Sequence, residues 1–310
     1  MKRILPLLLL LIPAALDLLS GNGLSLPGKE VFWQLRLPRM AAALLCGGAM
    51  GIAGAQMQAL FRNPLADPHL MGISGGAGLG ASLAAIGLGA GVSASTGTGA
   101  LVASAFAGAL VGSAIIVGVS LKVRSTATLL LCGVMLGFVC SALGSIAQYS
   151  AGEESLKLYY SWLSGSFATV GTRGLGILAF ALAAGFIMAL ADASRLDLVL
   201  FGDEFAASAG VSMRGIRLRT MLSTSIMAGA VTAFCGPVGF VGLAAPHLAR
   251  RIAGTSVHRQ VLPSSMLTGA GLALFADAAA HIGAHPIPVG STMALVGIPL
   301  VIILLWRQRL

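Results

Sequence analysis

Few side chains in this sequence are arranged as a catalytic site requires. Its one Gly-Lys pair, Gly28-Lys29, is followed by Glu30, so the chain lacks the Gly-Lys-Ser/Thr signature with which a P-loop binds ATP. There is no HExxH zinc motif and no serine nucleophile elbow. The glycine-rich run 72–80 lies in an apolar stretch with no strand before it, so we expect it to pack helices rather than bind a nucleotide. We therefore predict no catalytic residue, no cofactor and no enzyme activity.

Groups that could bind a metal or carry a proton are also sparse. Asp277 is the only acid that we expect at membrane depth, and we expect no second carboxylate beside it. His281 and His285 are expected at the outer mouth, where a role at an interface is far commoner than ligation of a metal. We predict no metal site. Four cysteines lie in apolar stretches without a CxxC pair, which favours small core residues: Cys46, Cys132, Cys140 and Cys235.

The composition indicates what positions these side chains. Hydrophobic residues make up 57% of the 310 residues and charged residues only 9%, whereas soluble domains carry about a quarter charged residues. This excludes an ordinary soluble enzyme, a disordered chain and a nucleic-acid-binding protein. The 42 glycines among the apolar residues are typical of a polytopic helical membrane protein, since small residues let helices approach closely.

Uncharged stretches predict an all-α membrane protein of about ten spans in one domain, residues 1–310. A cleaved signal peptide is the alternative interpretation of residues 1–20, although a clear cleavage site is missing. A span needs about 20 apolar residues. The predicted spans are 4–20, 40–61, 70–87, 99–121, 126–148, 174–192, 217–235, 238–252, 260–282 and 288–306.

The basic residues orient these spans. An even number of spans places both termini on one side of the membrane. Of the 19 Lys and Arg residues, 14 fall on that side and 5 on the other. Short cytoplasmic loops carry such an excess, so we predict cytoplasmic termini. This distribution also accounts for most of the net charge of +9 without a nucleic-acid partner.

The largest inner loop, residues 193–216, contains a short amphipathic segment, Asp203–Gly210, preceded by apolar residues at 198, 200 and 201. It could be a helix that lies at the membrane interface. Alternatively, it could be a docking helix that presents an apolar ridge to a cytosolic motor subunit.

Arg36 and Arg39 are expected on the outer side, against the charge bias, with Pro38 setting a turn before the second span. They could face lipid headgroups. Alternatively, they could be cationic anchors for an acidic surface of an extracytoplasmic partner.

A series of motifs from about residue 30 to the C-terminus resembles the permease subunits of type II ABC importers for iron chelates, haem and cobalamin. The segments that carry the resemblance, in family order, are Arg36–Arg39, Gln58–Pro68, Gly72–Gly78, Ser125–Thr126, Leu131–Gly133, Trp162–Ser166, Gly236–Leu243, Pro246–His247, Asp277 and Pro288–Gly290.

The resemblance implies a homodimer with the path between its two copies, in the bacterial inner membrane. Two cytosolic ATP-binding subunits would bind the inner loop, and a periplasmic substrate-binding protein would dock outside. The implied docking residues are Arg36, Arg39 and His281, which replaces a third arginine and could make docking pH-dependent. Thr126 and Ala127 match the cytoplasmic gate, although a helix cap next to Ser125 is an alternative role for the threonine. The implied ATPase-coupling residues are Asp203, Glu204, Ala206, Ala207 and Gly210.

The cargo is less well specified by the sequence. The segment 32–39 is closer to cobalamin permeases, and the segment 63–68 is closer to iron-chelate permeases. We expect import of haem or a ferric siderophore into the cytoplasm, with cobalamin as the alternative. A stand-alone secondary transporter would need coupling acids at depth, and a membrane-embedded enzyme would need a convergent polar site.

Overall fold

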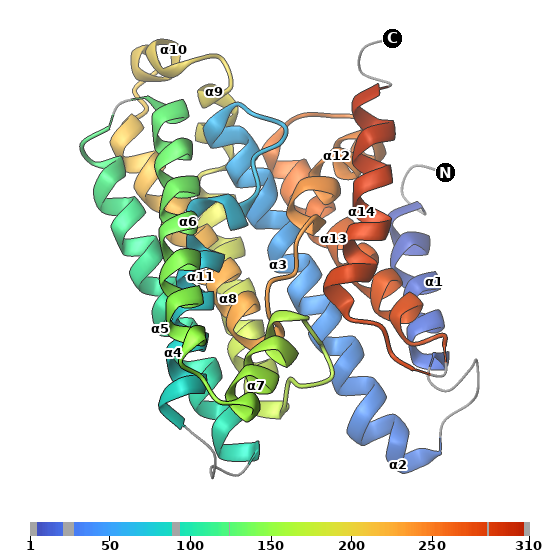
Figure 1. The fold of residues 1–310 in the computed structure, drawn as a ribbon. Coiled ribbons are helices and arrows are strands. Elements are labelled where there is room, and N and C mark those ends of the chain that lie inside the picture. The colour runs from blue at the N-terminus through green and yellow to red at the C-terminus, as the bar shows by residue number, and fades with distance from the viewer. Residues whose placement is uncertain (1–4, 21–27, 89–93, 124, 284, 307–310) are drawn as a thin grey trace.

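The computed structural model describes residues 5–20, 28–88, 94–123, 125–283 and 285–306, and every regular element in these ranges is a helix. The long helices run side by side in one bundle (Figure 1). In chain order the helices are α1 (Leu5–Leu19), α2 (Lys29–Val31), η1 (Phe32–Arg36), α3 (Leu37–Phe61), η2 (Pro68–Met71), α4 (Ile73–Leu88), α5 (Ala94–Ser120), α6 (Thr126–Tyr149), α7 (Glu153–Leu163), α8 (Thr172–Ala191), α9 (Ala193–Val199), α10 (Asp203–Ser208), α11 (Met213–Cys235), α12 (Val241–Ala253), α13 (His258–Ala280) and α14 (Val289–Trp306).

Each predicted span coincides with a helix, which confirms the polytopic all-α prediction. Among the described residues, six helical segments are long and apolar enough to cross a membrane, and shorter apolar helices add to them. The helix at the predicted span 238–252 is short and begins three residues later than predicted, at Val241. Because α12 has only 13 residues, it rises about 20 Å, less than the roughly 30 Å hydrocarbon core of a bilayer.

Glycines set the closest helix contacts. A Cβ added at Gly76 of α4 would overlap the backbone carbonyl of Gly108 in α5, and one added at Gly108 would overlap the carbonyl of Gly76. The same relation holds between Gly47 of α3 and Gly269 of α13. The glycine-rich run 72–80 therefore packs helices, as predicted.

The predicted turn at Pro38 is wrong. A continuous helical segment runs from Lys29 to Phe61, and Pro38 lies in the first turn of α3. The preceding π-helical turn η1 lets the Leu37 N–H reach the Phe32 carbonyl. Proline lacks an N–H donor, and its ring interferes with regular α-helical hydrogen bonding. Pro38 is tolerated at this position because the π-helical turn before it has already changed the hydrogen-bond pattern.

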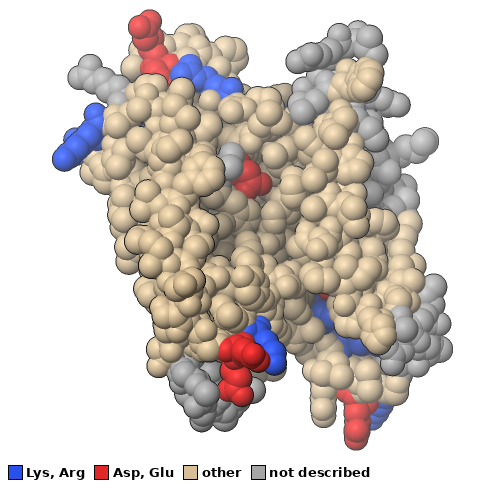
Figure 2. All heavy atoms as spheres, viewed as in Figure 1, with Lys and Arg blue, Asp and Glu red and all other residues tan. Residues whose placement is uncertain are grey.

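The two ends of the bundle differ. α14 ends at the end that carries α9 and α10, and α1 begins on the same side but further from that end, whereas α2 and α7 lie at the opposite end (Figure 1). On the face shown in Figure 2, charged atoms gather at these two ends, and the middle is uncharged apart from one acidic group inside a central hollow. This distribution fits a multi-pass membrane protein.

Candidate functional site

Two non-helical segments meet within the bundle rather than at its ends (Figure 1). The first links α3 to α4 through η2, and the second, residues 236–240, links α11 to α12. The His69 Nε2 atom lies 2.8 Å from the Val238 carbonyl oxygen, and its Nδ1 atom is hydrogen bonded to the Ser74 hydroxyl. The Asp67 carboxylate accepts the His69 N–H at 2.8 Å and caps η2. Non-helical backbone at membrane depth is tolerated where it is buried in protein or lines a cavity.

A cavity of about 440 Å³ adjoins these segments. Figure 2 shows a hollow near the centre of the viewed face, between α6 and α14. The lining is largely apolar with a few polar groups, the usual character of a site for a bulky organic ligand. The lining residues are Asp67, His69, Ser74, Pro237, Gly239, Phe240, Leu243 and Gly290. The sequence analysis assigned no path role to these residues, although the prolines and glycines inside uncharged stretches were a signal of broken helices.

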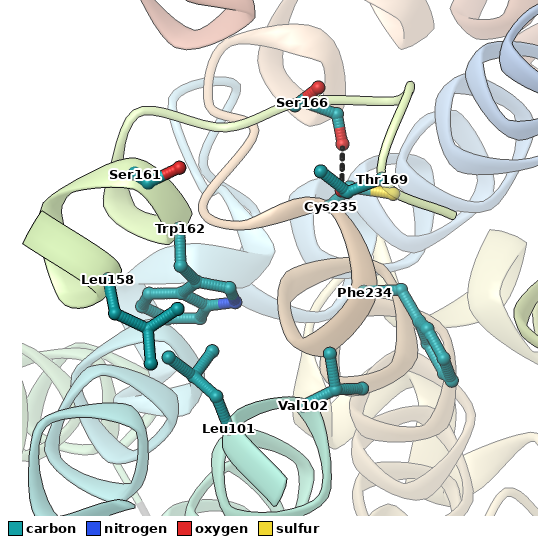
Figure 3. A pocket seen from close by; sticks show the side chains of 9 residues that line it. All are labelled: Leu101, Val102, Leu158, Ser161, Trp162, Ser166, Thr169, Phe234 and Cys235. Atoms are coloured by element: carbon teal, nitrogen blue, oxygen red, sulfur yellow. Dashed lines mark hydrogen bonds between the residues drawn. The ribbon is translucent and has the colours of Figure 1, made fainter. Parts of the chain in front are cut away.

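A second cavity, drawn in Figure 3, is much smaller, at about 70 Å³. The Trp162 indole of α7 points into it and donates to the Ala233 carbonyl at 3.0 Å, and the Ser166 N–H donates to the Cys235 carbonyl at 3.0 Å. These bonds fix α7 against the end of α11. Cys235 is buried with its sulfur 3.1 Å from that of Cys46, and both are free thiols. The two cysteines are therefore core residues, as predicted.

The inner loop forms two short helices, α9 and α10, whose apolar residues divide between a buried base and an exposed ridge. Ala206 is fully buried in a small core. In contrast, Phe201 is 73% exposed and Phe205 50% exposed, with ring centroids 5.4 Å apart. The base residues are Ala59, Leu196, Val199, Ala206, Val211 and Ile216.

The predicted coupling residues fall on both sides of α10. Glu204 and Ala207 are exposed beside the ridge, and Ala206 faces the base. Gly210 ends the segment with φ of 83°, a left-handed conformation that favours glycine. Asp203 is half-buried, and its carboxylate pairs with Arg62 and Arg217 at 3.1 Å each.

Arg217 connects this loop to the predicted gate. One of its terminal nitrogens binds Asp203, and the other donates to the Val123 carbonyl at 3.1 Å. Thr126 begins α6 three residues later, where the Ser125 hydroxyl accepts the Thr128 N–H at 3.3 Å as the N-cap. Thr126 is half-buried and Ala127 is exposed. Sequence analysis missed Arg62 and Arg217 because their roles depend on tertiary contacts.

The structure corrects two expectations at the α2 and α7 end of the bundle. Arg36 and Arg39 are each only 7% exposed rather than presented at the surface. Arg39 bridges Asp17 at 3.1 Å and Asp277 at 2.9 Å, so Asp277 does have a second carboxylate beside it. The reason is that α1 places Asp17 between α3 and α13, a contact that helix periodicity does not reveal.

The remaining two predicted docking residues also have partners within the chain. Arg36 donates to the Leu18 carbonyl at 2.6 Å. His281 follows α13, is mostly buried, and its Nδ1 atom lies 2.9 Å from the Asp277 carbonyl oxygen. Their docking role stays a prediction.

Comparison with known proteins agrees with this arrangement. A model of the FecCD transport family matches residues 12–307. The chain belongs to the FecCD transport family. Its relatives include the vitamin B12 import system permease protein BtuC of Klebsiella pneumoniae, 38% identical over 93% of this chain and 86% of the relative. BtuC of Escherichia coli O127:H6 is also 38% identical, over 98% of this chain and 92% of the relative.

Solved structures support the same assignment for this FecCD chain. A metal-chelate type ABC transporter in an inward-facing conformation matches 99% of the chain and 100% of its own length, with 32% identity and a TM-score of 0.88. PsaBC from Streptococcus pneumoniae, solved with a Fab, matches at 18% identity and a TM-score of 0.59, a likeness of fold. The chain is thus an ABC importer permease of the iron-chelate and cobalamin type.

Proposed function

We propose that this permease imports cobalamin, or a corrinoid like it, into the cytoplasm. The observation that carries the proposal is the 38% identity to vitamin B12 permeases over 98% of the chain. This favours cobalamin over the haem or ferric siderophore that the sequence analysis put first. The largely apolar cavity of about 440 Å³ beside the broken helices fits one wall of a path for a large organic chelate.

We further propose that a second copy of the chain completes the path. The cavity is open to the surface of the chain, and the hollow in Figure 2 lies near the centre of the viewed face. Two copies related by a two-fold axis would place two such hollows opposite each other. A wide path between copies holds a bulky cargo through weak contacts, which release it when the walls move.

The ATP-binding subunits would dock on α10, one on each copy. Phe201 and Phe205 form an apolar ridge on a packed base, a surface suited to a cleft in a partner. Movement of α10 would pass from Asp203 to Arg217 and from there to the Val123 carbonyl. That carbonyl lies just ahead of Thr126 and Ala127, which would then open or close the inner mouth.

The α10 end would face the cytoplasm of a bacterium and the α7 end the periplasm, where a binding protein would dock. The excess of basic residues in the loops at the α10 end supports this orientation. Because Arg36 and Arg39 are buried, they would support docking by fixing the outer ends of α1 and α3. His281 would do the same at the end of α13.

Uptake into liposomes tests the cargo. The permease is reconstituted with its ATP-binding subunit and binding protein, and ATP-dependent uptake of cobalamin, haem and a ferric siderophore is compared. The proposal predicts saturable uptake of cobalamin that excess siderophore does not reduce. Uptake of haem or siderophore with none of cobalamin would overturn the cargo assignment.

A further inference from the structure

Asp17, Arg39 and Asp277 form a buried cluster at the outer ends of three helices. Arg39 Nη2 lies 3.1 Å from Asp17 Oδ1, and Arg39 Nε lies 2.9 Å from Asp277 Oδ2. Both aspartates have 0% exposure, and Arg39 is 7% exposed. Two carboxylates therefore share one guanidinium inside the protein. If both were ionised, the cluster would carry one uncompensated negative charge.

The hydrogen bonds of the cluster also indicate that the two carboxylates lack a partner. Within the described residues, Asp17 Oδ2 and both Asp277 carboxylate oxygens are buried and accept no hydrogen bond of good geometry. Arg39 Nη2 also donates to the Asp17 and Ser20 carbonyls and to the Ser20 hydroxyl. Burial of an unpaired carboxylate costs several kcal/mol. Counted over the described residues, the cluster lacks one positive charge and at least one hydrogen-bond donor.

Among the described residues, the other charged groups of the packed elements lie beyond hydrogen-bond distance of these carboxylates or bind elsewhere. From η1, Arg36 binds the Leu18 carbonyl at 2.6 Å. At the end of α13, His281 Nδ1 is 2.9 Å from the Asp277 carbonyl but 3.6 Å from its carboxylate. Lys29 and Glu30 of α2 are exposed. The connection 21–27 contains no titratable side chain in its sequence.

We propose that this cluster is a proton-binding site, in which Asp17 and Asp277 share one proton next to Arg39. A single proton supplies both missing elements: it neutralises the excess charge, and as an O–H it donates to the second carboxylate. A metal ion is less suited, because the cluster offers only two carboxylates, which already bind the Arg39 guanidinium. Within the described residues, no group of three or more His, Cys, Asp or Glu is arranged to hold a metal ion.

The site makes the junction of α1, α3 and α13 sensitive to pH. In the unfolded chain an aspartate has released its proton well below neutral pH. The folded protein therefore binds one proton more than the unfolded chain near neutrality. Stability accordingly falls as pH rises through the range in which the cluster releases its proton, by up to tenfold in the folding equilibrium per pH unit.

Infrared spectroscopy of the purified protein in lipid nanodiscs tests the proposal. At pH 7 the wild type is expected to show the C=O stretch of a protonated carboxylic acid. D17N and D277N should each lose that band, because the remaining carboxylate is then balanced by Arg39. Asparagine keeps the size and a donor, so both variants should fold. The control E154Q changes an exposed acid of α7 and should keep the band.

Thermal unfolding supplies a second readout. The wild-type midpoint is expected to fall between pH 6 and about pH 9, whereas D17N should show a flatter profile. Absence of the acid band from the wild type, or its persistence in both D17N and D277N, would overturn the proposal. A wild type whose midpoint depends on added Na⁺ rather than on pH would overturn it in favour of a metal cation.

Discussion

Asp203 of α10 and Arg217 of α11 form an ion pair of 3.1 Å at the inner end of the bundle. The second terminal nitrogen of Arg217 holds the Val123 carbonyl, also at 3.1 Å. One side chain therefore joins the segment expected to bind the ATPase to the backbone that leads into the expected gate. A planar guanidinium can hold both partners at once, whereas an ammonium is a single point charge.

Replacement of Arg217 by lysine should uncouple ATP hydrolysis from transport. Loss of one charge-assisted hydrogen bond costs about 1.5–3 kcal/mol, so we expect transport per ATP to fall about tenfold with the ATPase still bound. The measurement is the ratio of uptake to hydrolysis in liposomes. R219K is the matched control, because Arg219 on the same helix pairs with Asp192 at 2.7 Å instead. Equal ratios of uptake to hydrolysis for R217K and R219K would show that the contacts of Arg217 with Asp203 and Val123 do not couple the ATPase to the gate.

Polar replacement of the ridge should detach the ATP-binding subunit. F201S and F205S remove apolar side chains that are 73% and 50% exposed, so the permease itself should fold normally. Co-purification with the ATP-binding subunit is expected to drop by at least tenfold. The control is L222S, on a helix face 42% exposed away from α10. Undiminished co-purification of the double variant would show that the ATPase docks elsewhere.

Arg39→Glu should disrupt folding rather than docking. The change places a third carboxylate against Asp17 and Asp277, which are both fully buried. Breaking a buried ion pair by removing one partner costs about 3–5 kcal/mol. The yield of monodisperse protein in detergent should therefore fall sharply. A normal yield with selective loss of binding-protein stimulation would instead support direct docking by Arg39.

Gly108→Ala should loosen the contact between α4 and α5. The added methyl would overlap the Gly76 backbone, and overpacking costs about 1–3 kcal/mol. Gly118→Ala is the control on the same helix, because nothing lies within 4 Å of its Cβ position. Thermal unfolding in nanodiscs should separate the two variants. The packing argument fails if G108A is as stable as G118A.

Filling the cavity with a larger side chain should hinder passage of the cargo without affecting binding of the ATP-binding subunit. Leu243 lines the cavity of about 440 Å³, and tryptophan there should lower maximal uptake severalfold while ATPase binding is unchanged. Leu248→Trp is the control, because this α12 residue lines a separate cavity of about 110 Å³. Full transport by L243W would place the path elsewhere.

The spans were predictable because hydropathy and charge bias act along the chain. The buried cluster was not, because it depends on which face of α1 meets α3 and α13. Two observations nevertheless pointed to it: Asp17 lies inside an apolar helix, and Arg36 and Arg39 oppose the charge bias. A charged residue inside an apolar helix, or a basic residue on the outer side, tends to require an ion-pair partner within the protein. The short length of α12, 13 residues, follows from the Gly236-Pro237 break, whose depth in the bundle the sequence does not give.

Energetics of uptake test the central claim, that a nucleotide-hydrolysing partner drives this permease through α10. Liposomes containing the permease alone, with an imposed proton or sodium gradient, should accumulate no cobalamin. Liposomes that also contain its ATP-binding subunit, supplied with binding protein, should accumulate it only with ATP. Accumulation by the permease alone on an ion gradient would contradict the account.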